Sequence, residues 1–346
     1  MTTLTREPAH ATPAGHRNGQ GPRQATPRLR GTAWLVWRQH RAAFWTVIGL
    51  TLIGVAVMVF LRGQMMDYLN AYDGSSPKSF SLPSDFETYS SDLTRVGGYL
   101  GFVPILAGVF LGAPLIAGDL ESGTAKLVTS QSVSRLRWLT TKLALTAALI
   151  ALSTAVLAVV YEWWWSPMKG RVGTQEWTSG AFFDVTNVMP VAYALLTFTV
   201  GAAAGLLLRR TLVSMVVTLG IVVAIEVVWD RFRLNLGHVL SVSSDQGVGP
   251  DARRPELPAQ GVQQGQGTYF LTSSGDRLDW TTCLDQGDTD QTRTACLESK
   301  HVIGWSLDYL PVSQMHPMQW LGAGIMLTIT AAVAAFIITW GRKRLL

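Results

Sequence analysis

The sequence has little charge and lacks the common catalytic signatures. Only 15% of its 346 residues are Asp, Glu, Lys or Arg, whereas soluble domains carry about 25%. The deficit is concentrated in blocks of roughly 20 residues, which is long enough for a helix to cross ~30 Å of hydrocarbon. A soluble fold is therefore excluded, and the sequence predicts an all-α integral membrane protein that crosses the bilayer several times.

Several activities are excluded by missing motifs. No stretch matches the phosphate-binding G-x-x-x-x-G-K-[ST] loop, and neither H-E-x-x-H nor G-x-S-x-G occurs. The apolar blocks contain no His, and Glu226 is their one acid, so a proton relay has almost no groups to use. We therefore expect no catalytic, cofactor-binding or metal-binding residue in this chain. Because the net charge of +5 follows membrane topology, as shown below, no nucleic-acid partner is expected.

Six apolar segments are predicted to span the bilayer. They are residues 42–61, 99–117, 143–161, 188–208, 212–229 and 319–340.

Two segments precede the first span. Residues 1–30 are rich in Pro, Gly, Thr and Arg and have no apolar face, which predicts a disordered tail. Residues 31–41 place Trp on one helical face and basic residues on the other, which is typical of an amphipathic helix lying in the membrane interface. The alternative interpretation is that residues 31–41 are simply the inner end of the first span.

The positive charge gathers in four segments that an even number of spans places on one side. These are the N-terminal segment 1–41, the loop 118–142, the turn at 209–211 and the C-terminal end, and they hold 16 of the 28 Lys and Arg residues. Their only acids are Glu7, Asp119 and Glu121. By the positive-inside rule this side is cytoplasmic. Both termini are therefore expected on the cytoplasmic side of a plasma membrane. The first five spans lie in residues 42–229, and the sixth span, followed by a basic tail, lies in residues 319–346.

The largest segment on the other side, residues 230–318, is expected to be a small extracellular domain. It contains the only two cysteines, Cys283 and Cys296, whose number, proximity and oxidising location predict a disulfide. A hairpin turning at 274–276 is predicted within it. Residues 302–310 carry two adjoining apolar stripes at helical spacing, which predicts a short apolar helix. That helix would rest on the outer leaflet or pack against the extracellular domain.

Two further features leave alternatives open. Gly201 and Gly205 form a G-x-x-x-G face that permits close helix approach, either inside one subunit or at a dimer seam. Glu226 lies within one turn of Trp229, at the outer end of its span. It would either reach headgroups, water, Arg231 or Arg233, or serve a substrate pathway.

The basic loop 118–142, between the second and third spans, contains a recognisable pattern. An acidic residue is followed by Gly-Thr, then by Ser-Arg, then by a Lys at the start of the next helix; these are Glu121, Gly123, Thr124, Ser134, Arg135 and Lys142. In these residues the sequence resembles the permease subunits of ABC-2 type transporters. Ser132 stands where that family often has Pro. The resemblance, with the six-span plan, covers residues 31–230 and 301–346.

The resemblance implies that residues 118–142 form a coupling loop resting in a cleft of a separate ATPase subunit, which would bind ATP and Mg²⁺. The candidate coupling residues are Asp119, Glu121, Ser122, Gly123, Thr124, Lys126, Ser134, Arg135 and Lys142. It also implies a second permease subunit, identical or not, and export of an amphipathic lipid, peptide or drug-like molecule.

Three other interpretations also fit the sequence. The loop could merely fix membrane topology. The chain could be a non-transporting membrane protein with a sensing or scaffold domain at 230–318, or it could be an ion-coupled secondary transporter.

Overall fold

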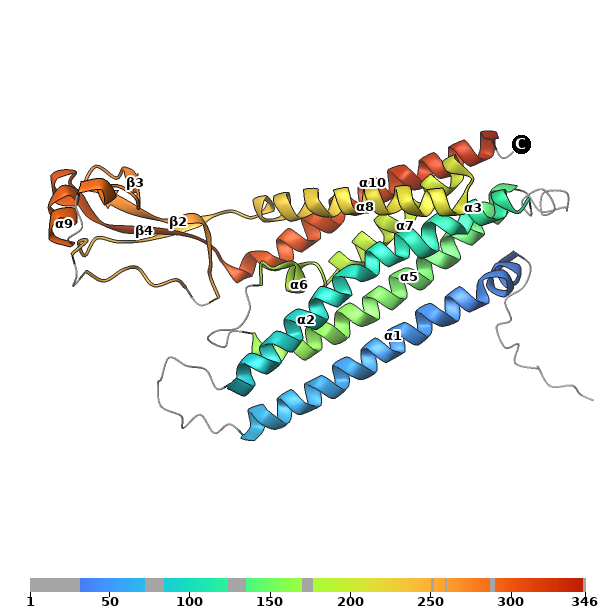
Figure 1. Ribbon diagram of the computed structural model, residues 1–346, viewed down its shortest axis with the longest axis horizontal. Helices are drawn as coiled ribbons and strands as arrows, with labels where there is room; N and C mark the ends of the chain where they lie inside the picture. Colours follow the sequence, from blue (N-terminus) through green and yellow to red (C-terminus); the bar gives the residue numbers. More distant parts are fainter. Residues whose placement is uncertain are drawn as a thin grey trace, which may run out of the picture.

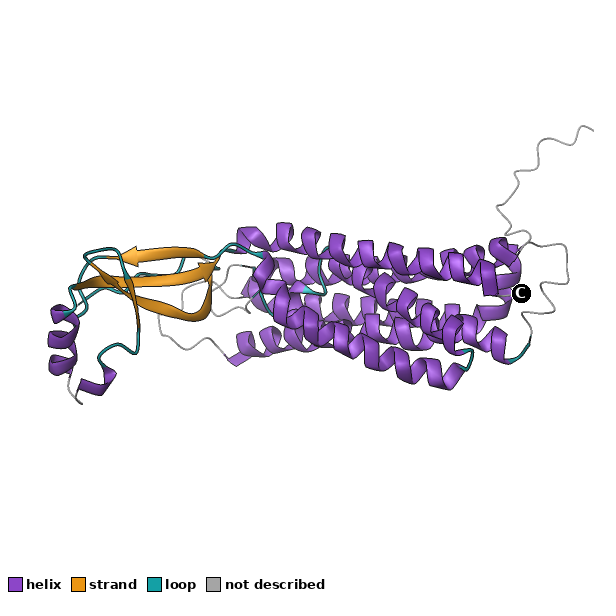
Figure 2. Cartoon of the chain, turned by 90° about the horizontal axis from the view of Figure 1, so that it is seen from above, coloured by secondary structure: helices purple, strands orange, loops and turns teal. Residues whose placement is uncertain are grey.

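The computed structural model describes residues 32–71, 84–123, 135–169, 177–249, 252–258, 260–286 and 290–344. The molecule is elongated, with a bundle of long helices at one end and a small β-sheet domain at the other (Figures 1 and 2). The strands leave the bundle between helices α8 and α10 (Figure 1). The helical class predicted from the sequence therefore holds for the bundle, while the sheet domain departs from it.

The six predicted spans are confirmed as six helical segments long and apolar enough to cross a membrane. They are formed by α1 (Thr32–Ala71), by α2 (Ser84–Leu106) with a π-helical turn (Ala107–Gly112) and α3 (Ala113–Glu121), by α5 (Arg135–Trp165), by α7 (Met189–Leu208), by α8 (Thr211–Phe232) and by α10 (Met315–Arg344).

Helix α1 is broken near its start. His40 has non-helical backbone angles (φ −109°, ψ 16°), so a short helix beginning at Thr32 joins the long span at a kink. The break falls at the end of the segment 31–41 that the sequence separated from the first span. Its placement in the membrane interface stays a prediction, and the predicted tail 1–30 lies outside the described residues.

Helix α7 lies at the centre of the bundle, where it packs against α2, α3, α5, α8 and α10. Its contact with the second span is made by backbone. A Cβ atom added to Gly201 would lie 2.2 Å from the carbonyl oxygen of Gly108, and one added to Gly205 would lie 2.3 Å from that of Ala113. The G-x-x-x-G face is thus used for packing inside one subunit, which decides between the two interpretations of these glycines.

The sheet domain is formed by four antiparallel strands in the order β1-β4-β2-β3. The strands are β1 (Leu240–Ser244), β2 (Val262–Thr272), β3 (Arg277–Asp279) and β4 (Val302–Leu310), and the short helix α9 (Asp290–Ser299) packs against β4. The segment 230–318 is therefore not all domain. Its first residues continue α8 and a 3₁₀ turn, and its last residues begin α10.

The apolar helix predicted over 302–310 is wrong, because this segment is the strand β4. The segment is nine residues long, and over so short a length helical and strand periods of apolar residues cannot be distinguished. The conformation is decided by partners distant in sequence. Leu307 is opposite Val242 of β1 on one edge and Thr268 of β2 on the other, so ladders form along both edges.

The two other predictions for this domain are confirmed. Strands β2 and β3 form a hairpin in which Phe270 pairs with Leu278, and the turn contains Gly275 with φ of +87°. Cys283 and Cys296 form a disulfide that joins the chain after β3 to α9. The bridge closes the domain's small core, whose other buried members include Phe270 and Trp305.

Candidate functional site

The two ends of the predicted coupling loop lie at the end of the bundle opposite the sheet domain (Figure 1). We call this the loop end; the start of α1, the α7–α8 turn and the end of α10 also lie there. The structure describes the loop as far as Gly123 and again from the first residue of α5, Arg135. Thr124, Lys126 and Ser134 lie outside the described residues.

The first end of the loop is a defined helix terminus. The backbone N–H and the hydroxyl of Ser122 both donate to the carbonyl of Gly118, at 3.1 and 2.7 Å. Gly123 follows with φ of +72°, a left-handed conformation that glycine adopts without steric cost. Gly123 thus lets the chain turn away from the end of α3.

A buried ion pair ties the two ends of the loop together. The ammonium of Lys142, on α5, donates to the Oδ2 of Asp119, on α3, and the Lys142 side chain is completely buried. The second carboxylate oxygen of Asp119 accepts from the amide of Gln39, on α1, at 2.7 Å. Trp138 places its ring 5.2 Å from the ammonium. Three spans are thus joined through one carboxylate.

The kink of α1 lies beside this pair. His40 follows Gln39 directly, and its Nε2 is buried with no hydrogen-bond partner among the described residues. Its ring lies 6.2 Å from that of Phe44. The short first helix of α1 is attached to α3 through Gln39, the residue before its kink.

Glu121 connects the loop to a second turn. Its Oε2 accepts a hydrogen bond from the backbone N–H of Thr211 at 2.8 Å. Thr211 is the first residue of α8, and the side chain of the preceding Arg210 provides no cap. A carboxylate satisfies a free N–H there and complements the positive end of the helix dipole. Glu121 thereby joins α3 to α8.

The structure brings together some predicted site residues and adds partners that sequence reasoning missed. Asp119 and Lys142 were predicted as parts of a polar loop, whereas both are buried inside the bundle. Gln39, the partner of Asp119, and Thr211, the partner of Glu121, were not predicted. One signal was available, since Lys142 directly precedes an apolar run in which a charge requires a partner.

A second polar cluster lies near the sheet domain. Asp184 accepts from the indole N–H of Trp229 and from a guanidinium nitrogen of Arg233, each at 2.7 Å, and Arg233 also pairs with Asp230 at 3.0 Å. Arg233 is therefore engaged away from Glu226. One carboxylate oxygen of Glu226 is buried with no hydrogen-bond partner among the described residues.

The Asp184 carboxyl provides a test of this cluster by pH. Burial, reinforced by the charge of Glu226, raises its pKa from 3.8 to about 6, against the opposing effects of Arg233 and Trp229. The folded protein therefore holds a proton that the unfolded chain releases at lower pH. This proton stabilises the folded protein fully at a pH below the pKa of Asp184 in the unfolded chain, and the stabilisation is lost as the pH rises through about 6. Between pH 5 and pH 7 the free energy of unfolding therefore falls by about 1 kcal/mol.

We expect Asp184→Asn to remove this part of the pH dependence of thermal stability, measured as the Tm of the detergent-solubilised protein. Asp230→Asn is the matched control, because it removes the exposed carboxylate that shares Arg233. An unchanged pH slope in Asp184→Asn would contradict the assignment.

The spans and the contacts between them define the class of protein. It is a multi-pass helical membrane protein whose loop end is cross-linked by buried and capping polar contacts. Comparison with family models then matches residues 30–233, more than half of the chain, to the family described as ABC-2 membrane transporter related. The chain belongs to this family, which supports a transporter permease. Comparison with curated proteins gave no match.

Proposed function

We propose that the chain is the transmembrane permease subunit of an ABC-2 type ATP-driven exporter. A separate ATPase subunit binds ATP and Mg²⁺ and docks on residues 118–142, and a second permease subunit, identical or not, completes the transmembrane unit. The basic segments at the loop end support placing both termini and this loop in the cytoplasm. The protein then lies in a bacterial plasma membrane with its sheet domain outside.

One observation carries this proposal, namely that both ends of the loop are joined to the bundle by the buried Asp119–Lys142 pair. Coupling between distant sites is carried by packed side chains, ion pairs and rigid elements. A displacement of the loop therefore moves α3 and α5 together. Gln39 passes it to α1, and Glu121 passes it to α8. A loop that only fixed topology would not need such connections.

The character of the substrate is proposed from family analogy and from one cavity. A cavity of about 470 Å³ lies between α1, the second span and α5, and apolar side chains dominate its lining. Its polar members are Thr46, Thr51, Ser153 and Thr154. Such a lining suits the apolar part of an amphipathic lipid, peptide or drug-like molecule.

The proposal is tested by isolating the chain from its own membranes in mild detergent and identifying the ATPase that accompanies it. We expect Lys126→Glu to lower the recovered ATPase by more than about tenfold, equivalent to about 1.4 kcal/mol. Lys300→Glu is the matched control, because it makes the same charge change on the sheet domain. Recovery of the ATPase from both variants alike would contradict docking at this loop.

Two further variants separate folding from docking. Glu121→Gln keeps an acceptor for the Thr211 N–H and should retain the ATPase, whereas Glu121→Arg should lose it. Size-exclusion profiles of each variant show whether it remains folded. If no nucleotide-binding protein accompanies even the wild-type chain in detergents that preserve other transporter complexes, the exporter proposal fails.

A further inference from the structure

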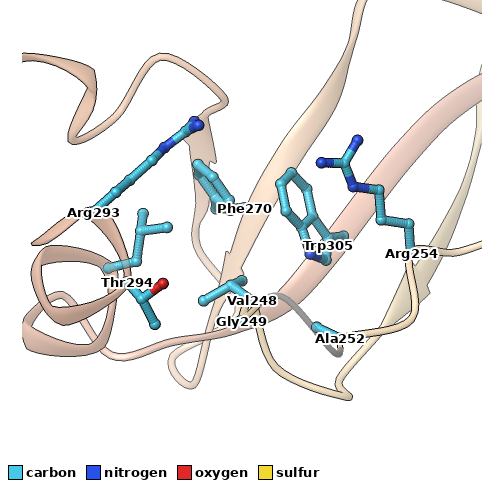
Figure 3. A pocket seen from close by; sticks show the side chains of 9 residues that line it. Val248, Gly249, Ala252, Arg254, Phe270, Arg293, Thr294 and Trp305 are labelled. Carbon is cyan, nitrogen blue, oxygen red and sulfur yellow. The ribbon is translucent and has the colours of Figure 1, made fainter. Parts of the chain in front are cut away.

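A small pocket lies in the sheet domain between the sheet, α9 and the chain after β1. Its volume is about 190 Å³, below the roughly 300–1,000 Å³ of sites for drug-sized ligands. Phe270 and Trp305 form its floor, and Arg293 and Arg254 flank them on either side (Figure 3). The pocket is thus suited to a compact molecule and not to a folded segment of another protein.

The four side chains form a continuous row, in which the two ring planes are tilted by 44° to each other. The rings of Phe270 and Trp305 are 4.5 Å apart between centroids. The guanidinium of Arg254 lies 4.8 Å from the centroid of Trp305, and that of Arg293 lies 5.8 Å from the centroid of Phe270. Arginine stacked on an aromatic face keeps the N–H groups at its edge available for a further partner. Two cations therefore border one aromatic surface.

The positive charge of the pocket is not neutralised by the part of the chain that the structure describes. Neither Arg254 nor Arg293 forms an ion pair there. Arg293 is held in position by the backbone carbonyl of Trp280, to which it donates at 2.8 Å.

Two buried donors at the pocket also lack acceptors among the described residues. They are the indole nitrogen of Trp305, a residue only 8% exposed, and the Nε of Arg293. A buried donor without a partner is unusual in proteins and calls for a specific explanation. These two donors, together with the two guanidinium groups that lack an ion pair among the described residues, indicate that the pocket binds an acceptor that carries negative charge.

We propose that this pocket binds a small organic carboxylate with a compact apolar or aromatic body. The carboxylate accepts hydrogen bonds from Arg254 and from the indole of Trp305, which lie at one end of the row, because guanidinium–carboxylate bonds are among the strongest polar contacts. Arg293, at the other end beside Phe270, adds positive charge to the pocket. The apolar body lies against Phe270, Val248 and Leu297, which line the same cavity. The sheet domain is thereby a binding module for such acids, and its binding step requires no ATPase.

The test uses the full-length chain in nanodiscs of zwitterionic phosphatidylcholine, with 4-fluorobenzoate as the probe and ¹⁹F NMR line broadening as the readout. We expect saturable binding that is weakened about tenfold by Arg254→Gln, which removes a charge-assisted bond, and by a smaller factor by Arg293→Gln, which removes a more distant positive charge. Lys300→Gln removes one positive charge from the same domain outside the pocket and should leave the affinity unchanged. The neutral 4-fluorobenzamide should bind far more weakly than the acid.

Several results would overturn the proposal. They are an absence of saturable binding by the wild-type chain, equal binding of the amide and the acid, and an equal loss in Lys300→Gln. Displacement of the probe by inorganic phosphate at equal concentration would contradict the need for an apolar body. Binding that appears only in Asp251→Asn would also contradict it, because a carboxylate of the chain itself would then be the acceptor.

Discussion

We expect Lys142→Met to destabilise the protein more than any other single polar substitution in the bundle. The change removes the ammonium that pairs with the buried Asp119 carboxylate, while the Gln39 amide still donates to it. Removing one member of a buried ion pair typically costs about 3–5 kcal/mol, because an uncompensated charge remains. The measurement is the Tm and the yield of monodisperse protein in detergent. A Tm close to the wild-type value would show that Asp119 does not depend on Lys142.

The double variant Asp119→Asn with Lys142→Met separates the charge from the packing. Neither position is then ionised, the methionine fills the space of the lysine stem, and the amide oxygen of the introduced asparagine can still accept from Gln39. We expect most of the lost stability to return, since neutral replacements of buried pairs are often tolerated. The ATPase should still co-purify, because the pair lies within the bundle beneath the loop. Loss of the ATPase from this folded variant would instead place the pair in the docking surface.

The spans could be predicted from the sequence because they depend on local information. Length and hydropathy suffice for a membrane helix, as the six segments show. The Asp119–Lys142 pair illustrates what such information omits. Both residues were recognised as polar ends of one loop, but their burial depends on α3 and α5 lying side by side with α1 across them. That arrangement is a property of the whole bundle.

Strand β4 shows the same limit in the sheet domain. Residues 302–310 satisfy a helical spacing of apolar side chains, and nothing local rules it out. The segment is a strand because β1 and β2, from two distant parts of the chain, flank it. The hairpin between β2 and β3 was predictable because its turn signal lies within a few residues of both strands. Predictability thus follows sequence separation between partners.

The second large effect is expected at the backbone contact between α7 and the second span. A Cβ at Gly201 would lie 2.2 Å from the Gly108 carbonyl oxygen and 2.9 Å from the Ala113 nitrogen. Both obstacles are backbone atoms, so a rotamer change cannot relieve them. Gly201→Ala must therefore push the central helix away from its neighbour. Overpacking of this kind typically costs about 1–3 kcal/mol and sometimes more.

Gly220→Ala, on α8, is the matched control, because no atom lies within 4 Å of its added Cβ. Alanine in a helix interior is favoured over glycine by about 0.5–1 kcal/mol, so this variant should be neutral or stabilised. The Tm of Gly201→Ala should fall, whereas that of Gly220→Ala, measured in the same detergent, should stay the same or rise. If Gly201→Ala instead left the Tm unchanged and reduced only a dimer population in cross-linking, the face would be a subunit seam. The close contact inside one chain predicts the first outcome.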